Sequence, residues 1–385
     1  MEPLTHNVIA DVLVIGAGIT GAAIADALAV AGVRVAVADK RGLVQGSTVA
    51  STALVQYEID TPLIALTRKI GKDKARRAWR RSRLAVEALA TRLGELKVPD
   101  VVRRDSLYLA GNVLGAAELR REHQARRAIG LSERFLDRAT LRRNFGIARS
   151  AALQGYNNLV IDPRKSTFAL LSAATANGAR IFRSPELTAV VPNRNGVTVT
   201  AANGTQLHCG HLVFATGYEV PRGVPRRHHK ITSTWAIATV RQAKESLWPG
   251  QCCIWEASDP YLYIRTTPEG RVICGGGDAE FSDETKRDAL TSRKCEMLRR
   301  KLHRLLPQLD TTVEFAWAGS FGATTTGLPI IGEIPGMPRC LIALGYGGNG
   351  TTYAGIAADV IVGAISGKRD ADADLFHVPG HDAAR

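Results

Sequence analysis

The sequence predicts an α/β protein in which a parallel sheet forms one domain, with either a second domain or an inserted one beside it. Two observations lead to this prediction. The N-terminal residues follow an unbroken strand–helix–strand pattern. The chain also has 385 residues, more than one typical domain. Hydrophobic residues make up 45% of the chain and charged residues 22%, as in a globular protein that buries a full core.

The first forty residues contain every part of a βαβ unit. Residues 10–15 (ADVLVI) have the apolar, β-branched composition of a buried parallel strand. After a glycine-rich turn, residues 22–31 repeat apolar side chains at helical spacing, and Gly32 is a natural helix stop. Residues 34–38 (RVAVA) form a second strand, which ends at Asp39. These parts predict a Rossmann-like domain.

The turn of this unit has the G-x-G-x-x-G spacing that binds a dinucleotide. Gly16 permits a tight turn, Gly18 lets the backbone approach the pyrophosphate, and Gly21 lets the helix pack on the strand. The helix start offers free N–H groups to phosphate, and an acid about 20 residues further on accepts hydrogen bonds from a ribose. The contacts predicted from this unit are Gly16, Gly18, Ile19, Thr20, Gly21 and Asp39.

The segment that follows favours FAD over NAD as the dinucleotide. Residues 46–53 (GSTVASTA) are small and rich in hydroxyl groups, so a loop and helix start can lie close against a ligand and donate hydrogen bonds to it. The alternative interpretation is a plain helix-capping cluster. The contacts predicted from this segment are Lys40, Ser47, Thr48, Ser51 and Thr52.

Together with later blocks, these residues resemble the superfamily of FAD enzymes that contains D-amino acid oxidase and glycine/sarcosine oxidase. Residues 158–172 (NLVIDPRKSTFALLS) resemble the segment through which that family re-enters its FAD domain. Residues 179–200 alternate like paired strands, one of which touches the adenine in the family, and residues 213–217 (VFATG) resemble its Ala-Thr-Gly turn. The resemblance implies cofactor contacts from Val190, Thr216 and Gly217.

Two blocks near the C-terminus extend the resemblance. Residues 327–332 (GLPIIG) resemble the family's DGLPIIG block, with Thr326 in place of the usual Asp. Residues 341–352 (LIALGYGGNGTT) resemble the glycine-rich turn that passes the flavin ring, where amides at a helix start stabilise the negative charge of the reduced flavin. The implied contacts are Gly345, Gly347, Gly348, Asn349, Gly350 and Thr351.

The resemblance implies a discontinuous FAD-binding domain with an inserted, mixed α+β substrate domain. We assign residues 1–85, 150–222 and 323–385 to the first and residues 86–149 and 223–322 to the second. Sarcosine-type oxidases attach their flavin to a cysteine just before the Gly-Leu-Pro block, and residues 317–326 contain none, so we predict non-covalent FAD. The same stretch also lacks the arginine that clamps the substrate carboxylate in some members.

A predicted strand in the middle of the chain offers a replacement for that arginine. In residues 261–266 (YLYIRT), period-2 alternation puts Tyr261, Tyr263 and Arg265 on one face. A guanidinium and a phenol together bind a carboxylate well, so we hypothesise that Arg265 and Tyr263 bind the substrate. The alternative is a sheet face turned to solvent. Tyr57 and Tyr346 are further pocket candidates, with packing as the alternative role.

The predicted function is oxidation by FAD of the C–N bond of a small amino or imino acid, or of a related amine, to an imine that water hydrolyses. The flavin carries the electron chemistry, so the protein mainly positions the substrate. The alternatives are an FAD-dependent dehydrogenase of a hydroxy acid or polyol phosphate, and a partner-dependent flavoprotein subunit. The electron acceptor is oxygen or a quinone-like carrier. The resemblance implies a lysine within residues 271–277 if oxygen is used, as in sarcosine oxidases, and its absence favours the carrier.

The remaining features concern partners and location. The formal net charge is +14, but no nucleic-acid-binding motif occurs, and an anionic cofactor and substrate fit the charge. Residues 61–96 read as a basic helical segment, which suits either a solvated face or contact with an anionic membrane. The six cysteines form no C-x-x-C pair, so no metal site is predicted. Residues 1–7 lack the features of a signal peptide, and we expect the protein in the cytoplasm.

Overall fold

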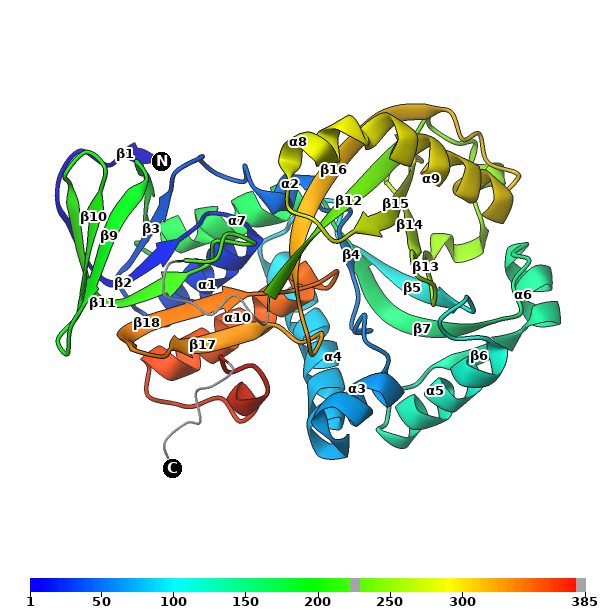
Figure 1. Ribbon diagram of the computed structural model, residues 1–385, viewed down its shortest axis with the longest axis horizontal. Helices are drawn as coiled ribbons and strands as arrows, with labels where there is room; N and C mark the ends of the chain where they lie inside the picture. Colours follow the sequence, from blue (N-terminus) through cyan, green and yellow to red (C-terminus); the bar gives the residue numbers. More distant parts are fainter. Residues whose placement is uncertain (222–228, 379–385) are drawn as a thin grey trace.

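Two nine-stranded sheets organise the computed structural model, which describes residues 1–221 and 229–378. Figure 1 shows them at opposite ends of the molecule. The first sheet contains the strands of residues 2–39, 180–214 and 330–344, and the second contains the strands of residues 54–160 and 229–324. The predicted domain boundary at residues 222 and 223 lies outside the described residues, so the division into domain ranges stays a prediction.

The first sheet has a parallel core built from segments far apart in the sequence. Each core strand ends on the same side, where the chain turns back over the sheet. Its register places Val14 of β2 opposite both Val37 of β3 and Val213 of β11. The parallel strands are β2 (Val8–Ile15), β3 (Val35–Asp39), β8 (Arg180–Arg183), β11 (Gln206–Phe214) and β18 (Met337–Leu344). This arrangement confirms the predicted Rossmann-like fold.

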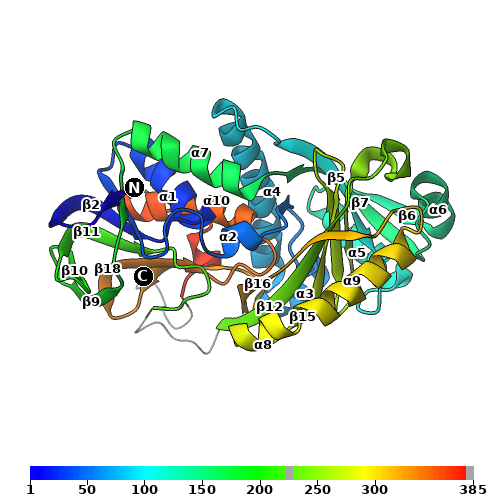
Figure 2. The same cartoon turned by 90° about the horizontal axis from the view of Figure 1, so that it is seen from above.

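Three helices cover one face of this sheet, as Figure 2 shows from above. They are α1 (Ile19–Val30), α7 (Pro163–Ala176) and α10 (Gly350–Ile365), which pack side by side. Val12, Val14, Ile24 and Leu28 are fully buried between helix and sheet. The parallel core is completed at its margins by β1 (Glu2–Pro3), β9 (Leu187–Pro192), β10 (Val197–Ala201) and β17 (Ile330–Ile334).

The second sheet is mixed. Its strands pair antiparallel except for β13, which runs parallel to β5. The strand predicted within residues 261–266 is confirmed as β14, which forms a hairpin with β15. Its strands are β4 (Leu54–Val55), β5 (Val102–Leu109), β6 (Arg134–Asp137), β7 (Ala151–Val160), β12 (His229–Thr239), β13 (Cys253–Glu256), β14 (Leu262–Thr266), β15 (Val272–Ala279) and β16 (Val313–Thr324).

The helices of this half flank the second sheet. A buried apolar cluster that includes Trp235, Ile264 and Leu298 joins the sheet to α9. The helices are α5 (Ala116–Ala128), α6 (Arg138–Phe145), α8 (Glu284–Ala289) and α9 (Thr291–Leu305), with the short turns η2 (Lys244–Ser246) and η3 (Pro249–Gln251) between β12 and β13.

The basic segment predicted to be helical, residues 61–96, forms two helices between the sheets. α3 (Leu63–Ile70) and α4 (Lys72–Glu95) are separated at Gly71, whose φ of +88° lies in the left-handed region that glycine adopts without strain. In Figure 1, α4 crosses the molecule between its two halves.

Several arginines of α4 bind partners within the chain. Arg77 pairs with Asp372 at 2.9 Å and also with Asp374, and Arg81 pairs with Asp370 at 2.8 Å. These acids flank or belong to the turn η4 (Ala373–Leu375), which therefore neutralises part of the basic face. Contact with an anionic membrane gains no support from these arginines. None of the described helices is long and apolar enough to cross a membrane.

Candidate functional site

A cavity of about 990 Å³ opens between the two sheets, next to the start of α1. Its size is at the upper end for small-molecule sites. Every predicted cofactor contact except Gly21 and Asn349 lines it. The lining residues that were predicted are Gly16, Gly18, Ile19, Thr20, Asp39, Lys40, Ser47, Thr48, Ser51, Thr52, Val190, Thr216, Gly217, Gly345, Gly347, Gly348, Gly350 and Thr351.

The glycine turn at the end of β2 leaves no room for side chains. Gly16 has a φ of +112°, and a Cβ there would lie 2.4 Å from the Ala215 carbonyl oxygen. A Cβ on Gly21 would lie only 1.8 Å from the carbonyl oxygen of Gly16. Gly21 is therefore where helix and turn touch, which explains why it does not line the cavity and agrees with the packing role expected of it.

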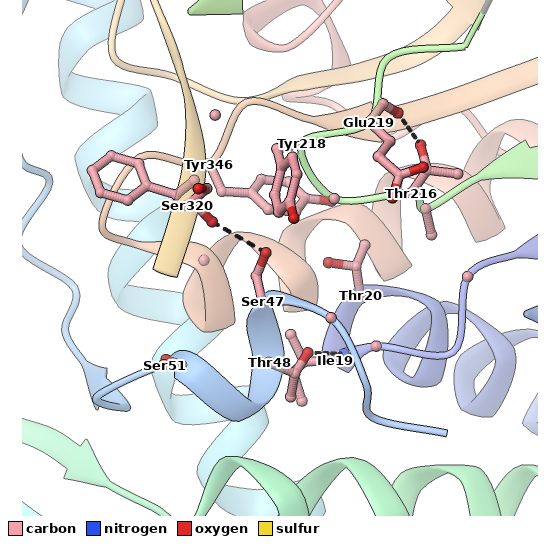
Figure 3. A pocket seen from close by; sticks show the side chains of 18 of the residues that line it. Ile19, Thr20, Ser47, Thr48, Ser51, Thr216, Tyr218, Glu219, Ser320 and Tyr346 are labelled. Carbon is pink, nitrogen blue, oxygen red and sulfur yellow. Dashed lines mark hydrogen bonds between the residues drawn. The ribbon is translucent and has the colours of Figure 1, made fainter. Parts of the chain in front are cut away.

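The start of α1 presents donors to the cavity. The first intrahelical bond is donated by the Ala22 amide to the Gly18 carbonyl, at 2.9 Å, so the amides of Thr20 and Gly21 have no acceptor among the described residues. The Ile19 amide donates to the Thr48 hydroxyl at 3.0 Å, a contact drawn in Figure 3. Free amides and the positive end of a helix dipole suit a pyrophosphate.

Asp39, at the end of β3, holds together the backbone segments that form the cavity wall next to this turn. One carboxylate oxygen accepts from the Ala17 amide at 2.8 Å, and the other accepts from the amides of Arg41 at 2.8 Å and Gly42 at 3.0 Å. The first oxygen keeps a lone pair for a ribose hydroxyl. Beside it, the Lys40 ammonium lies 2.9 Å from Glu219. These contacts fit the adenosine end of a dinucleotide.

The turn before α10 offers fewer free amides than its sequence suggests. The Gly347 amide donates to the Gly322 carbonyl at 2.8 Å, and the Gly348 amide donates to an Asp60 carboxylate oxygen at 2.7 Å. The helix begins its own bonds at the Tyr353 amide. Among the described residues, the unbonded donors that line the cavity here include the amides of Gly350 and Thr351 and the Tyr346 hydroxyl.

Asn349 belongs to the support of this turn rather than to the cavity wall. It is 5% exposed. Its side-chain amide donates to the Glu58 carbonyl at 2.8 Å, and its side-chain oxygen accepts from the Asp60 amide at 3.1 Å. Asn349 thus ties the start of α10 to residues 58–60, and its predicted direct contact with the cofactor is corrected to a positioning role.

The predicted substrate group is only partly assembled. Tyr263 and Tyr346 line the cavity, but Arg265 does not. The Arg265 guanidinium is buried and donates to the carbonyls of Thr52 and Thr266, and burial lowers its pKa to about 10. Alternation along β14 fixes only where the side chain starts, and this long side chain ends among backbone carbonyls. The predicted clamp of Arg265 with Tyr263 is therefore not formed.

Tyr57 is also absent from the cavity wall. Its side chain is fully buried, and its hydroxyl donates to Glu133 at 3.0 Å. Glu133 in turn pairs with the buried Arg126, whose guanidinium lies 4.3 Å from the ring centre of Trp79. The packing alternative for Tyr57 is the correct one.

The sequence analysis did not predict Asp60, which lines the cavity beside Gly348 in the turn before α10. Trp255 of β13 and Thr234 of β12 also line the cavity, and neither lies in a recognisable sequence motif. The Thr234 hydroxyl donates to Asp278 at 2.6 Å and lies 3.2 Å from the Tyr263 hydroxyl. Burial raises the pKa of Asp278 to about 6, and the nearby Asp60 adds to this shift.

A second buried acid, Glu58, lies behind the cavity and provides a test of stability against pH. Ser106 and Asn158 donate to one of its carboxylate oxygens, while the other has no partner among the described residues. Burial first, and then the charge of Glu133, raises the Glu58 pKa to about 7. The folded protein therefore favours the protonated form of Glu58. The contribution of this proton to the free energy of unfolding is complete below pH 4.5, the pKa expected in the unfolded chain, and it is lost as the pH rises through about 7.

Glu58→Gln should therefore stabilise the protein at pH 8, by on the order of 3 kcal/mol at most. The glutamine resembles the protonated acid and removes the cost of ionising a buried carboxyl. The gain in melting temperature should shrink as pH falls through 7 and vanish only below the unfolded pKa of 4.5. The control is Glu95→Gln, at a side chain that is 58% exposed. A gain for Glu58→Gln that does not change with pH would contradict the account.

Comparisons with known proteins agree with this geometry. A family model described as FAD-dependent oxidoreductase (DAO) matches residues 11–364. The probable oxidoreductase OrdL of Haemophilus influenzae is 23% identical over 380 residues, which cover 95% of this chain and 85% of that protein.

Two solved structures share the fold over nearly the whole chain. The glycine oxidase of Geobacillus kaustophilus has a TM-score of 0.81 and 21% identity, covering 98% of this chain and 100% of that one. The L-α-glycerophosphate oxidase of Mycoplasma pneumoniae, solved with FAD bound, has a TM-score of 0.75 and 18% identity, covering 93% of this chain and 95% of that one. At these identities the two structures establish the fold alone.

Proposed function

Because the chain belongs to the FAD-dependent oxidoreductase (DAO) family, we propose that it oxidises the C–N bond of a small amine or amino acid to an imine. When it is bound, FAD accepts the two electrons that leave the substrate. The free amides at the start of α1, Asp39 and the amides of Gly350 and Thr351 would hold it. These residues fit a dinucleotide by their donors and by the close approach that the glycines allow.

The observation that best supports the proposal is the composition of the cavity beyond the dinucleotide turn. Trp255, Tyr261 and Tyr263 of the second sheet line it, so an apolar, aromatic wall faces the segment before α10. Such a wall excludes water and orients a small substrate, which is what hydride transfer needs from the protein. The glycine oxidase among the similar proteins supports a C–N substrate.

The same cavity supports non-covalent FAD. No cysteine or histidine lines it among the residues that the structure describes. The six cysteines are all buried elsewhere in the fold. A thiol link of the sarcosine-oxidase kind therefore has no residue to form it. Location in the cytoplasm stays a prediction.

A second candidate is oxidation of a polyol phosphate, which the similarity to L-α-glycerophosphate oxidase favours. A phosphate needs cationic or amide donors. The lining cations of the described chain are Lys40 and Arg41, which both pair with Glu219 at the adenosine end. We therefore rank this candidate below the amine.

Anaerobic bleaching of the bound flavin tests the proposal. The yellow protein is mixed without oxygen with amines, amino acids, N-methyl amino acids, hydroxy acids and glycerol phosphates, and its visible absorbance is followed. Bleaching by a C–N substrate is expected. Bleaching by a hydroxy compound alone would establish the second candidate instead. Admitting oxygen or a soluble quinone to the reduced protein then identifies the acceptor by the faster recovery of colour.

A further inference from the structure

The charges around the cavity are distributed unevenly. The cations that line it, Lys40 and Arg41, lie beside Asp39 and both contact Glu219. At the other end, among the aromatic residues of the second sheet, the charged lining residue of the described chain is Asp60. A substrate held at that end therefore meets a carboxylate and, among the lining residues that the structure describes, no cation.

Three cations lie behind this wall, and each already has partners in the chain. Arg265 donates to the Thr52 and Thr266 carbonyls. Arg287 donates to the Ser320 hydroxyl at 2.9 Å and pairs with Asp288, and Lys294 donates to the Gly277 carbonyl. None of the three is a lining residue. A bidentate clamp for a carboxylate is thus not built into the described wall.

Asp60 is placed to receive a positive charge. One of its carboxylate oxygens accepts from the Gly348 amide at 2.7 Å, and the other has no hydrogen-bond partner among the described residues. The Asp60 side chain is exposed to the cavity, and desolvation by the surrounding protein raises its pKa. Burial first, and then the nearby Asp278 carboxylate, raises the pKa of Tyr261 and Tyr263, so Asp278 places a second acid next to the same wall.

The aromatic side chains at this end of the cavity also favour a positively charged ligand. Trp255 stacks on Tyr108 with ring centres 3.8 Å apart, and Tyr261 and Tyr263 form a tilted pair at 5.5 Å. Trp255 and both tyrosines line the cavity. Indole and phenol faces attract cations, and a carboxylate beside them completes the surroundings that an ammonium group prefers.

We propose that the substrate is a cationic amine without an α-carboxylate, bound by Asp60 within the wall of Trp255, Tyr261 and Tyr263. This inference rests on the proposed function and narrows its substrate class, because an α-amino acid would bring its own carboxylate beside Asp60. Ammonium binding by Asp60 is a charge-assisted hydrogen bond, which is stronger than a neutral one.

Binding of charged probes to the FAD-loaded enzyme tests the proposal apart from turnover. Benzyltrimethylammonium and benzoate have similar aromatic rings and opposite charges, and neither can be oxidised by hydride loss at a C–N bond in the way proposed. Their dissociation constants are read from perturbation of the flavin spectrum. We expect the ammonium probe to bind roughly tenfold more tightly or better. Tighter binding of benzoate, or binding of neither probe, would overturn the proposal.

Variants then assign the preference to Asp60. Asp60→Asn keeps an oxygen for the Gly348 amide and removes the charge. The quaternary probe has no N–H to donate, so it reports the attraction between charges, and its binding should weaken by roughly tenfold while FAD content stays unchanged. Asp73→Asn, at an exposed acid on α4, is the matched control and should bind both probes as the parent does. A preference that survives Asp60→Asn would contradict the assignment.

Turnover of matched pairs separates failure of this inference from failure of the proposed function. Putrescine and ornithine differ by one α-carboxylate, as do benzylamine and phenylglycine. Faster anaerobic bleaching by the decarboxylated member of a pair supports both conclusions. Faster bleaching by the amino acid overturns the inference and leaves C–N oxidation standing. A hydroxy acid that bleaches the flavin while all amines fail overturns the proposed function.

Discussion

Gly21→Ala is expected to yield a protein without bound FAD. The new Cβ would lie 1.8 Å from the Gly16 carbonyl oxygen and 2.9 Å from its carbon, and both atoms are backbone. No side-chain movement relieves this overlap, so α1 must shift away from the glycine turn. The amides that face the pyrophosphate move with the helix. We also expect a stability loss of about 1–3 kcal/mol or more, as for other overpacked cores.

The measurement is the ratio of visible to ultraviolet absorbance after purification, with thermal unfolding alongside. Gly94→Ala is the matched control, because Gly94 lies in α4 and a Cβ there meets nothing within 4 Å. That variant should keep its FAD and gain up to about 1 kcal/mol from the better helix propensity of alanine. A fully yellow Gly21→Ala protein would show that the turn tolerates movement and would contradict the proposed cradle.

Arg126→Met is expected to cause the largest loss of stability. The side chains of Arg126, Glu122 and Glu133 are each no more than 1% exposed, and Arg126 contacts the two acids at 2.8 and 3.2 Å. Methionine fills much of the space but leaves two buried carboxylates without their cation. Breaking a buried ion pair by removing one partner typically costs about 3–5 kcal/mol.

Chemical unfolding at pH 7.5 measures this loss. The control is Arg121→Met on the same helix, where the arginine is 65% exposed and pairs with Glu118. Exposed pairs contribute little, so that variant should lie within about 0.5 kcal/mol of the parent. Equal effects of the two substitutions would show that the buried network does not stabilise the fold.

Much of the cofactor site could be predicted from the sequence because its determinants are local. The turn from Gly16 to Gly21 has its strand, its helix and Asp39 within forty residues, so spacing alone fixes their relation. The blocks around Thr216 and Gly350 lie far along the chain, and only the family resemblance linked them to that turn. The structure places both at the cavity.

The substrate wall could not be predicted in the same way. Arg265 shares a strand face with Tyr263, but the direction of a long side chain depends on tertiary acceptors such as the Thr52 carbonyl. Tyr57 follows the small-residue segment directly, yet its hydroxyl meets Glu133, 76 positions away. Asp60 carries no motif, and its place beside Gly348 depends on a contact across 288 positions. Residue spacing contains no information on such contacts.

The central claim is that bound FAD in this cavity oxidises a C–N bond. A single turnover without oxygen tests it most directly. The enzyme is reduced by the amine that bleaches it best, and the released carbonyl compound and ammonia (or amine, for a secondary substrate) are quantified against the FAD reduced. The account predicts one equivalent of each per flavin. Reduction of the flavin with a carbonyl product and no nitrogen released would contradict it.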